Sequence, residues 1–368
     1  MKVPLLDLNA QYLPVMSEIK AELDKVFSTH QYILGTAVKE FEEDMQMYLQ
    51  VKHAIGCASG TDALQLALMA LGIAAGDEVI TTPFTFFATA SAIHRVGATP
   101  IFVDIDSRTY NLNPDLLEKA ITPRTKAIMP VHLFGQPANM NSIAEIAAKH
   151  QLKIIEDNAQ GIGAKYDGAF AGTIGDIGTL SFFPSKNLGA MGDGGMVLTN
   201  DDELALRLKQ LRVHGENPKY FHKWVGLNSR LDSLQAAALK IKLRQLDKWS
   251  AQRRENAKIY HELLTDLPEI NLPYIDPKAL TIYNQFTITC RDRDGLMAHL
   301  QKNDIGCAIY YPLSLHLQEC FAHLGGKKGD FPVCEDLSQK VLSLPIYSEL
   351  TREQIEYVCQ KIKEYFTK

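Results

Sequence analysis

The chain has 368 residues, of which 46% are hydrophobic and 22% are charged. These fractions are close to the averages of globular proteins, so they exclude a disordered chain, a collagen and a coiled coil. The 38 basic and 43 acidic residues give a formal net charge of −5, and neither sign forms a long block. The composition therefore excludes the strongly basic surface of a protein that binds nucleic acid or an anionic membrane.

The sequence predicts neither export nor membrane insertion. Asp7 interrupts the segment in which a signal peptide needs an apolar stretch. The longest apolar run, residues 66–75, spans ten residues, whereas a helix needs about 20 to cross a bilayer. The six cysteines form no CxxC pair and are far sparser than in a disulfide scaffold. We therefore expect a cytoplasmic protein with reduced thiols.

Between residues 53 and 200, short β-branched runs alternate with helical stretches. Strands are predicted at residues 53–57, 78–82, 99–104, 127–131, 153–156 and 179–183, and helices at residues 63–71, 87–95 and 140–150. Strands separated by helices of this length imply right-handed crossovers and a mostly parallel sheet that is covered on both faces. Ligands bind beyond the carboxyl ends of such strands, so the residues that follow each strand are the candidates for a site.

The pattern changes after residue 230. Leu231, Leu234, Ala238 and Ile241 recur at spacings of 3, 4 and 3, which predicts an amphipathic helix. We expect this helix to continue with little interruption to Leu264. Further strands are predicted at residues 285–290 and 306–310, and further helices at residues 293–302 and 352–366. We therefore predict an α/β protein with a large domain at residues 1–245 and a small α+β domain at residues 246–368.

Common cofactor and metal motifs are missing from the sequence. Gly161 and Gly163 begin a dinucleotide fingerprint, but Tyr166 stands where its third glycine is needed. Neither GxxxxGK[ST] nor HExxH occurs. The 11 histidines show no metal-ligand spacing with cysteine, so we expect no metal site.

The first candidate for a site follows the strand at residues 53–57. Ser59, Gly60 and Thr61 begin a helix there. Free backbone N–H groups and the helix dipole bind phosphate at such a position, and Thr61 adds a hydroxyl. The alternative is a Ser/Thr helix cap, which is the commoner use of these residues.

The second candidate is a carboxylate within residues 154–160 (IIEDNAQ), at the end of a buried strand. One interpretation is a helix cap or a structural ion pair. The other is an acceptor that holds the ring nitrogen of a ligand in its protonated form. The residues alone leave both interpretations open.

The third candidate is Lys186, which lies past another strand in the apolar, turn-rich segment of residues 181–187. Desolvation lowers the pKa of a lysine and gives the neutral amine that forms a Schiff base. Residues 192–195 (GDGG) allow a close backbone approach or a tight turn. The alternative is a solvated surface charge, the commonest state of a lysine.

Together the three candidates predict one cofactor. Pyridoxal 5′-phosphate (PLP) needs a lysine for its aldehyde, an acid opposite its pyridine nitrogen and a cradle for its phosphate. The acid matters because a protonated ring accepts the electron pair that remains when the substrate loses its Cα proton. Lys186, once released from the cofactor, is then free to move that proton as general base and acid.

These segments, with others in order along almost the whole chain, resemble the DegT/DnrJ/EryC1/StrS family of sugar aminotransferases. The resemblance rests on residues 3–8 (VPLLDL), 59–64 (SGTDAL), 76–80 (GDEVI), 156–160 (EDNAQ), 181–189 (SFFPSKNLG), 192–195 (GDGG), 228–232 (NSRLD), 310–316 (YYPLSLH) and 342–345 (LSLP). It implies a fold-type I PLP-dependent transferase, with a mostly parallel seven-stranded sheet in the large domain and a small C-terminal domain. It also implies a homodimer whose active sites lie at the subunit interface.

The resemblance implies roles for the cofactor-binding residues. Lys186 resembles the lysine that forms the Schiff base with PLP, and Asp157 resembles the partner of the pyridine nitrogen. Gln160 corresponds to the residue near the ring hydroxyl. The implied phosphate site consists of Gly60, Thr61 and Ser181, and of Asn228 from the neighbouring subunit. Phe86 resembles the aromatic residue that stacks on the ring, with a core phenylalanine as the alternative.

The implied substrate residues follow in the second half of the chain. Arg230 is a candidate for pairing with a diphosphate or a sugar carboxylate, and its alternative is an interface or helix-start ion pair. His222 lies on a polar, aromatic loop suited to sugar contact, with a plain surface histidine as the alternative. Tyr310, Tyr311 and His316 resemble the substrate-proximal strand end of the family.

The implied function is amino transfer, with glutamate as the usual donor, to a keto sugar on a nucleotide diphosphate, as in the biosynthesis of polysaccharide amino sugars. Residues 81–89 and 228–232 resemble members that act at the 3-position of the sugar, and the 4-position is the alternative. A PLP-dependent sugar dehydratase is disfavoured because such members replace the lysine by histidine, whereas this chain keeps Lys186. A regulator that only binds PLP is disfavoured because no basic segment is left for a DNA-reading domain.

Overall fold

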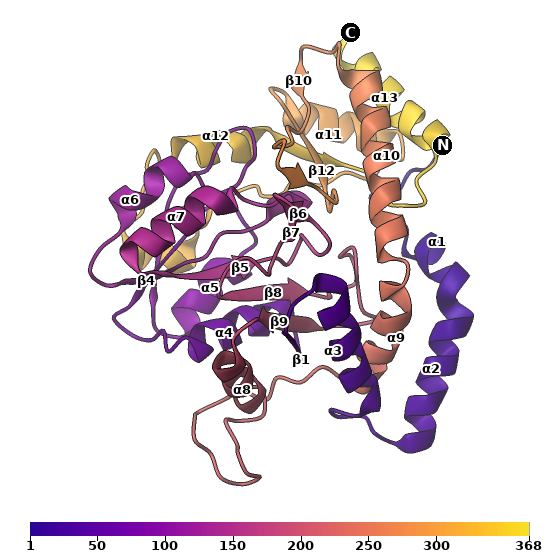
Figure 1. Cartoon of the computed structure of the whole chain (residues 1–368). Coiled ribbons are helices and arrows are strands. Elements are labelled where there is room, and N and C mark those ends of the chain that lie inside the picture. The colour runs from indigo at the N-terminus through magenta and orange to yellow at the C-terminus, as the bar shows by residue number, and fades with distance from the viewer. Residues whose placement is uncertain (368) are drawn as a thin grey trace.

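A seven-stranded sheet forms the centre of the computed structural model, which describes residues 1–367 (Figure 1). Its strands are β1 (His53–Cys57), β2 (Glu78–Thr81), β3 (Thr99–Phe102), β4 (Thr125–Ile128), β5 (Lys153–Asp157), β8 (Ile177–Ser181) and β9 (Gly195–Thr199). The spatial order is β1-β9-β8-β5-β4-β2-β3, and only β9 runs antiparallel to its neighbours. The predicted α/β class with a mostly parallel sheet is therefore confirmed.

Helices cover both faces of this sheet (Figure 1). One face carries α4 (Gly60–Ala70), α5 (Ala88–Arg95) and α8 (Asp202–Leu211), and the other carries α3 (Thr36–Leu49), α7 (Met140–His150) and α9 (Ser233–Leu243). Every residue of β2 and β9 is buried as a result. This double cover explains why the strands read as continuous apolar runs in the sequence.

A smaller antiparallel sheet forms a second core. It consists of β10 (Ile270–Asn271), β12 (Phe286–Cys290) and β13 (Val341–Leu344), packed with α10 (Leu246–Leu264), α11 (Arg293–Lys302) and α13 (Arg352–Phe366). The remaining elements are α1 (Leu8–Tyr12), α2 (Met16–Thr29), α6 (Leu117–Ala120), α12 (Pro332–Lys340) and a third sheet of β6 (Lys165–Tyr166), β7 (Ala169–Phe170) and β11 (Ala279–Leu280). The domain boundary at residue 245 stays a prediction. Across residues 1–367, every helix is too short or too polar to span a bilayer.

The strands predicted at residues 127–131 and 179–183 each begin two residues earlier in the structure, and two other predicted elements differ more. The helix expected from residue 231 to 264 is divided into α9 and α10, because Gln245 N bonds to Lys242 O, 3.0 Å away, in a tighter turn. The strand expected at residues 306–310 is wrong. Ala308 alone pairs with Ser343, while Gly306 N donates to Val3 O over 2.8 Å, so the segment divides its hydrogen bonds between two partners.

Candidate active site

One cavity of about 620 Å³ lies beyond the ends of β5 and β8. It brings together most of the residues predicted from the sequence: Gly60, Thr61, Phe86, Asp157, Gln160, Ser181, Lys186, Tyr310 and Tyr311. These residues come from segments up to 251 positions apart. They meet because parallel strands deliver the residues that follow them to one edge of the sheet.

Asp157 ends β5, and its carboxylate is buried. Its Oδ2 accepts a hydrogen bond from Thr89 Oγ1 at 2.7 Å, and its Oδ1 accepts one from the backbone N–H of Ala159 at 3.2 Å. Burial raises the pKa of Asp157, while these bonds and the nearby Lys186 act in the opposite direction. The carboxylate is thus oriented by two donors and lies within the field of a lysine.

Lys186 lies in the turn after β8, where its backbone N–H bonds to Phe183 O at 2.8 Å. Desolvation lowers the pKa of its ammonium to about 8, and the charge of Asp157 opposes this shift. Lys186 is only partly exposed and lines the cavity, so it differs from an ordinary solvated lysine on the surface. The turn is tight, since a Cβ on Gly189 would lie 2.2 Å from Pro184 O.

The N-terminus of α4 is capped by a side chain and also presents backbone N–H groups that are free to bind a ligand. Ser59 Oγ accepts from Asp62 N at 3.1 Å, as the cap interpretation expects. The N–H groups of Gly60 and Thr61, in the first turn, have no acceptor within the helix. A Cβ on Gly60 would lie 2.6 Å from Ser181 Cβ, so only glycine allows this close approach of helix and strand. The cap interpretation is therefore confirmed, and the phosphate-binding interpretation stays a prediction that the free N–H groups are compatible with.

Phe86 is 58% exposed and lines the cavity, whereas Phe84 is fully buried. The alternative of a core phenylalanine is therefore wrong for Phe86, and that role belongs to Phe84. The Phe86 ring lies 6.4 Å from the ring of Tyr311. Gln160 fixes this corner, because its Nε2 donates to Tyr311 Oη at 3.1 Å and its Oε1 accepts from Phe134 N at 2.6 Å.

Four predicted residues lie outside this cavity. Asn228 and His222 are exposed on the segment between α8 and α9, where His222 Nδ1 lies 3.0 Å from His214 O, and Arg230 is half-buried at the end of this segment. His316 is buried, and its Nε2 lies 3.0 Å from Glu335 Oε1. In this structure His316 pairs with Glu335 instead of lining the cavity, because α12 brings that carboxylate against it.

Sequence reasoning missed two residues. Thr89 bonds to Asp157 from the first turn of α5, and Gln285 lines the cavity from the residue before β12. Thr89 ends the segment of residues 81–89 that the family resemblance singled out, but that resemblance gave it no role, and Gln285 stands in no motif. Each reaches the site through a contact between segments distant in the sequence. Among residues 1–367 no group of three or more His, Cys, Asp or Glu side chains could hold a metal ion.

Comparisons with known proteins agree with this geometry. The model of the DegT/DnrJ/EryC1/StrS aminotransferase family matches residues 15–363, so the chain belongs to this family. Its members are PLP-dependent aminotransferases of fold type I, which confirms the expected class, cofactor and enzyme type. The cavity fits PLP, because it offers a lysine of lowered pKa, a buried carboxylate and unpaired N–H groups at a helix terminus.

Individual relatives match over nearly the full length. A pleiotropic regulatory protein of Geobacillus stearothermophilus is 50% identical and covers 100% of this chain and 99% of its own. The UDP-N-acetyl-3-dehydro-alpha-D-glucosamine 3-aminotransferase of Acidithiobacillus ferrooxidans is 46% identical over 98% of this chain and 97% of its own. The crystal structure of S. venezuelae DesV in complex with a ketimine intermediate has a TM-score of 0.97 at 42% identity, covering 100% of this chain and 99% of that chain.

Proposed function

We propose that the protein transfers an amino group from an amino acid, with glutamate as the expected donor, to the 3-keto carbon of a sugar linked to a nucleotide diphosphate. The observation that carries the proposal is the meeting of Lys186, Asp157 and the N-terminus of α4 in one cavity. At about 620 Å³, this cavity has room for a cofactor and part of a substrate. The 3-aminotransferase activity named for the A. ferrooxidans relative supports the 3-position.

When bound, PLP supplies an aldehyde that joins amino groups covalently and a pyridine ring that withdraws electrons. Lys186 Nζ binds the cofactor and, when free, takes or gives one proton at the substrate carbon. Its pKa of about 8 leaves part of the amine neutral near neutral pH, as a proton acceptor requires. The Asp157 carboxylate holds the proton on the ring nitrogen, and Thr89 orients this carboxylate.

The remaining cavity residues bind and orient the cofactor. Gly60 and Thr61 bind the phosphate through their backbone N–H groups, with the Ser181 hydroxyl beside them. Phe86 would cover the ring and exclude water from one side. Gln160 would interact with the ring hydroxyl.

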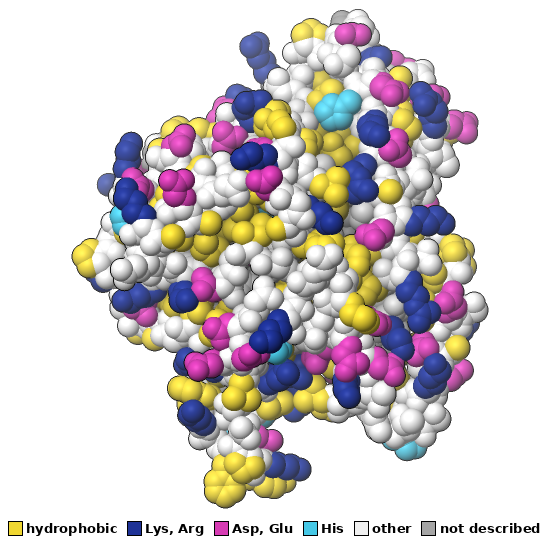
Figure 2. Space-filling view, in the orientation of Figure 1, with side chains coloured by type: hydrophobic (Ala, Val, Ile, Leu, Met, Phe, Trp, Pro, Cys, Tyr) yellow, Lys and Arg dark blue, Asp and Glu magenta, His cyan; other side chains and the backbone are white. Residues whose placement is uncertain are grey.

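We further infer that two copies form a homodimer. The segment between α8 and α9 projects from the body of the molecule (Figure 1), and hydrophobic side chains gather at its end (Figure 2). Tyr220 and Val225 on this segment are 78% and 93% exposed, and clustered apolar exposure favours a protein partner. In a dimer, Asn228 completes the phosphate site of the other copy, and His222 and Arg230 contact the sugar and the diphosphate.

The alternatives have less support. A sugar dehydratase is disfavoured by the retained Lys186, and a 4-keto sugar by the name of the A. ferrooxidans relative. Another relative is named a regulatory protein, but three relatives that are named for an activity are sugar aminotransferases, so a protein that only binds PLP has less support.

The proposal is tested by a reverse half-reaction. The purified enzyme, loaded with PLP, is incubated with 3-amino and 4-amino nucleotide sugars, and conversion of the cofactor to its amine form is followed by absorbance. We expect conversion with a 3-amino sugar and none by Lys186→Ala. Conversion only by 4-amino sugars contradicts the 3-position, and a normal cofactor–lysine absorbance in Lys186→Ala contradicts the role of that lysine.

A further inference from the structure

A second cavity of about 70 Å³, here called the side cavity, adjoins the active-site cavity. The two share Ser185, Gln285 and Tyr310 as wall residues. Ser185 directly precedes Lys186, so the shared wall lies next to the reacting lysine. The side cavity also has Arg253 of α10 and Asn284 in its wall, and both are buried. A small group on a substrate held at Lys186 is therefore in a position to extend into it.

Among residues 1–367, Arg253 is a buried cation without a paired anion. It is 2% exposed, and its Nη1 donates to the carbonyl oxygens of Tyr283 and Ile346, both at 2.9 Å. Its Nε has no hydrogen-bond partner among residues 1–367. Desolvation lowers its pKa to about 10, and the charge of Glu349 opposes this shift only in part. An unpaired buried charge is costly, so this site favours an anionic ligand.

Two amide oxygens in the same wall also have no partner within residues 1–367, namely Asn284 Oδ1 and Gln285 Oε1. The orientation of Asn284 is fixed, because its Nδ2 donates to Asn187 Oδ1 at 2.8 Å. Gln285 can turn its amide to present either the oxygen or the nitrogen. Buried polar groups are almost always hydrogen-bonded, so three unpartnered atoms around one cavity indicate a polar occupant.

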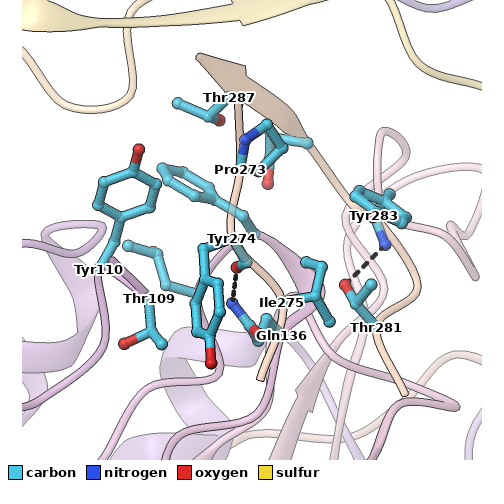
Figure 3. Close-up of a pocket in the computed structure, with 12 residues that line it drawn as sticks. Thr109, Tyr110, Gln136, Pro273, Tyr274, Ile275, Thr281, Tyr283 and Thr287 are labelled. Carbon is cyan, nitrogen blue, oxygen red and sulfur yellow. Dashed lines mark hydrogen bonds between the residues drawn. The ribbon is translucent and has the colours of Figure 1, made fainter. Parts of the chain in front are cut away.

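A third cavity, drawn in Figure 3, is too small to hold such a polar ligand. Gln285 is in its wall too, with Gln136, Tyr274 and Tyr283 around it (Figure 3). Its volume is about 20 Å³, and Gln136 Nε2 is already satisfied by Tyr274 O at 3.0 Å. That space holds about one water molecule, so an organic group reaches only the side cavity.

We propose that the side cavity binds a carboxylate of the amino acid that donates the amino group. The inference rests on the proposed aminotransferase function and assigns its donor site. A guanidinium favours a planar carboxylate, and about 70 Å³ accommodates a carboxylate but not a nucleotide diphosphate. A rotated Gln285 amide donates a second hydrogen bond to the anion, and Asn284 Oδ1 accepts from a water beside it.

A purely structural role for Arg253 is the competing explanation, because its Nη1 also joins two loops through carbonyl oxygens. Arg293 provides a matched control. It is likewise buried and donates to the carbonyl oxygens of Ser338 and Val341, both at 3.3 Å, but it belongs to the wall of neither cavity. Unlike Arg253, it also pairs with an anion, since its Nε lies 2.5 Å from Asp294 Oδ1. If Arg253 is only structural, Arg253→Met and Arg293→Met lower activity alike. If Arg253 binds the donor, only Arg253→Met weakens the dependence on the amino-acid donor.

Asn284→Asp is the sharper variant, because it places a carboxylate in the side cavity beside Arg253 and thereby competes with the donor. With the PLP-loaded enzyme, we expect the L-glutamate concentration for half-maximal cofactor conversion to rise roughly tenfold or more, which is about 1.4 kcal/mol or more of binding. The absorbance of the bound cofactor and the concentration dependence for the nucleotide amino sugar stay as in the wild type. Calorimetric titration with 2-methylglutamate, which has no Cα proton to lose, gives an independent binding constant that weakens in parallel.

Comparing L-glutamate with L-alanine identifies which carboxylate is bound: a loss with both donors assigns the α-carboxylate, and a loss with glutamate alone assigns the side-chain carboxylate. Unchanged donor dependence in Asn284→Asp overturns the proposal, as does an equal loss for donor and sugar in both arginine variants. If no amino acid converts the cofactor of the wild-type enzyme, the aminotransferase proposal itself fails. That result differs from the two outcomes that overturn the donor site alone.

Discussion

Thr89 Oγ1 donates a hydrogen bond of 2.7 Å to Asp157 Oδ2, joining the first turn of α5 to the end of β5. Both residues are buried, and Thr85 Oγ1 lies 3.0 Å from the Thr89 hydroxyl on its other side. Burial raises the pKa of Asp157, and the Thr89 bond is foremost among the interactions that lower it. Thr89 therefore helps to keep ionised the carboxylate that is proposed to hold the proton on the ring nitrogen of the cofactor.

Replacing Thr89 by valine removes this bond with little change in volume. The pKa of Asp157 then rises further, so a smaller fraction of the carboxylate is ionised at any given pH. We expect the acid limb of the kcat–pH profile to move to higher pH. A hydrogen bond to a charged group is worth about 1.5–3 kcal/mol, so kcat at neutral pH falls roughly tenfold to a hundredfold. Thr89→Ser keeps the donor and serves as the control; a profile for Thr89→Val that matches the wild type contradicts this role.

Asp157→Asn tests the carboxylate itself. The amide keeps the shape of the side chain but does not hold a proton on the pyridine nitrogen, so the cofactor loses its electron-withdrawing form. We expect the variant to retain bound cofactor by absorbance and to lose most of its turnover in both half-reactions. Activity close to that of the wild type excludes the proposed role of Asp157.

The sequence was sufficient to predict Asp157 and Lys186, because each follows a strand and the carboxyl ends of parallel strands share one edge of the sheet. The sequence was not sufficient to predict that Thr89 or Arg253 lies at the site. Thr89 meets its partner across 68 positions, and the carbonyl oxygens that bind Arg253 lie up to 93 positions away. Such contacts depend on how whole elements pack, and no local pattern encodes them.

The same limit explains what the motifs alone left undecided. Phe86 and Phe84 stand two residues apart in one motif, yet one lines the cavity and the other is core, as decided by the backbone turn before α5. His316 matched a motif, but the placement of α12 brings Glu335 to its ring. The types of residue thus predicted which reaction the chain supports. Tertiary packing decided which of these side chains line the active-site cavity.

The phosphate cradle predicts a steric effect at Gly60. In Gly60→Ala the new methyl group would lie 2.6 Å from Ser181 Cβ, so the N-terminus of α4 has to move away from β8. We expect weaker binding of PLP and of free phosphate in the apoenzyme, measured by calorimetry. Gly192→Ala is the control, since its methyl group meets only the Nε2 end of the flexible Gln235 side chain. Equal affinities for phosphate in Gly60→Ala and the wild type argue against the cradle.

A last prediction concerns Lys242, a fully buried lysine of α9 that holds the turn carrying Lys186. Its Nζ donates to Gly189 O and lies 4.0 Å from the centre of the Tyr12 ring, and Tyr12 Oη donates to Ala190 O at 3.2 Å. Desolvation lowers the pKa of Lys242 to about 7 from the ordinary value of 10.5. Between these two pH values the unfolded chain binds more protons than the folded one, so this group makes the free energy of unfolding rise with pH.

Lys242→Met removes that titration while keeping a long apolar side chain. We expect the wild type to gain stability relative to Lys242→Met between pH 7 and pH 10, as measured by urea unfolding of the apoenzyme at several pH values; taking the difference cancels the other titrating groups. Lys240→Met is the control, because Lys240 pairs with Glu40 and its pKa is raised, which produces no such rise in this window. If the difference between wild type and Lys242→Met does not change with pH, Lys242 is not desolvated in solution, and its proposed support of the Lys186 turn loses its basis.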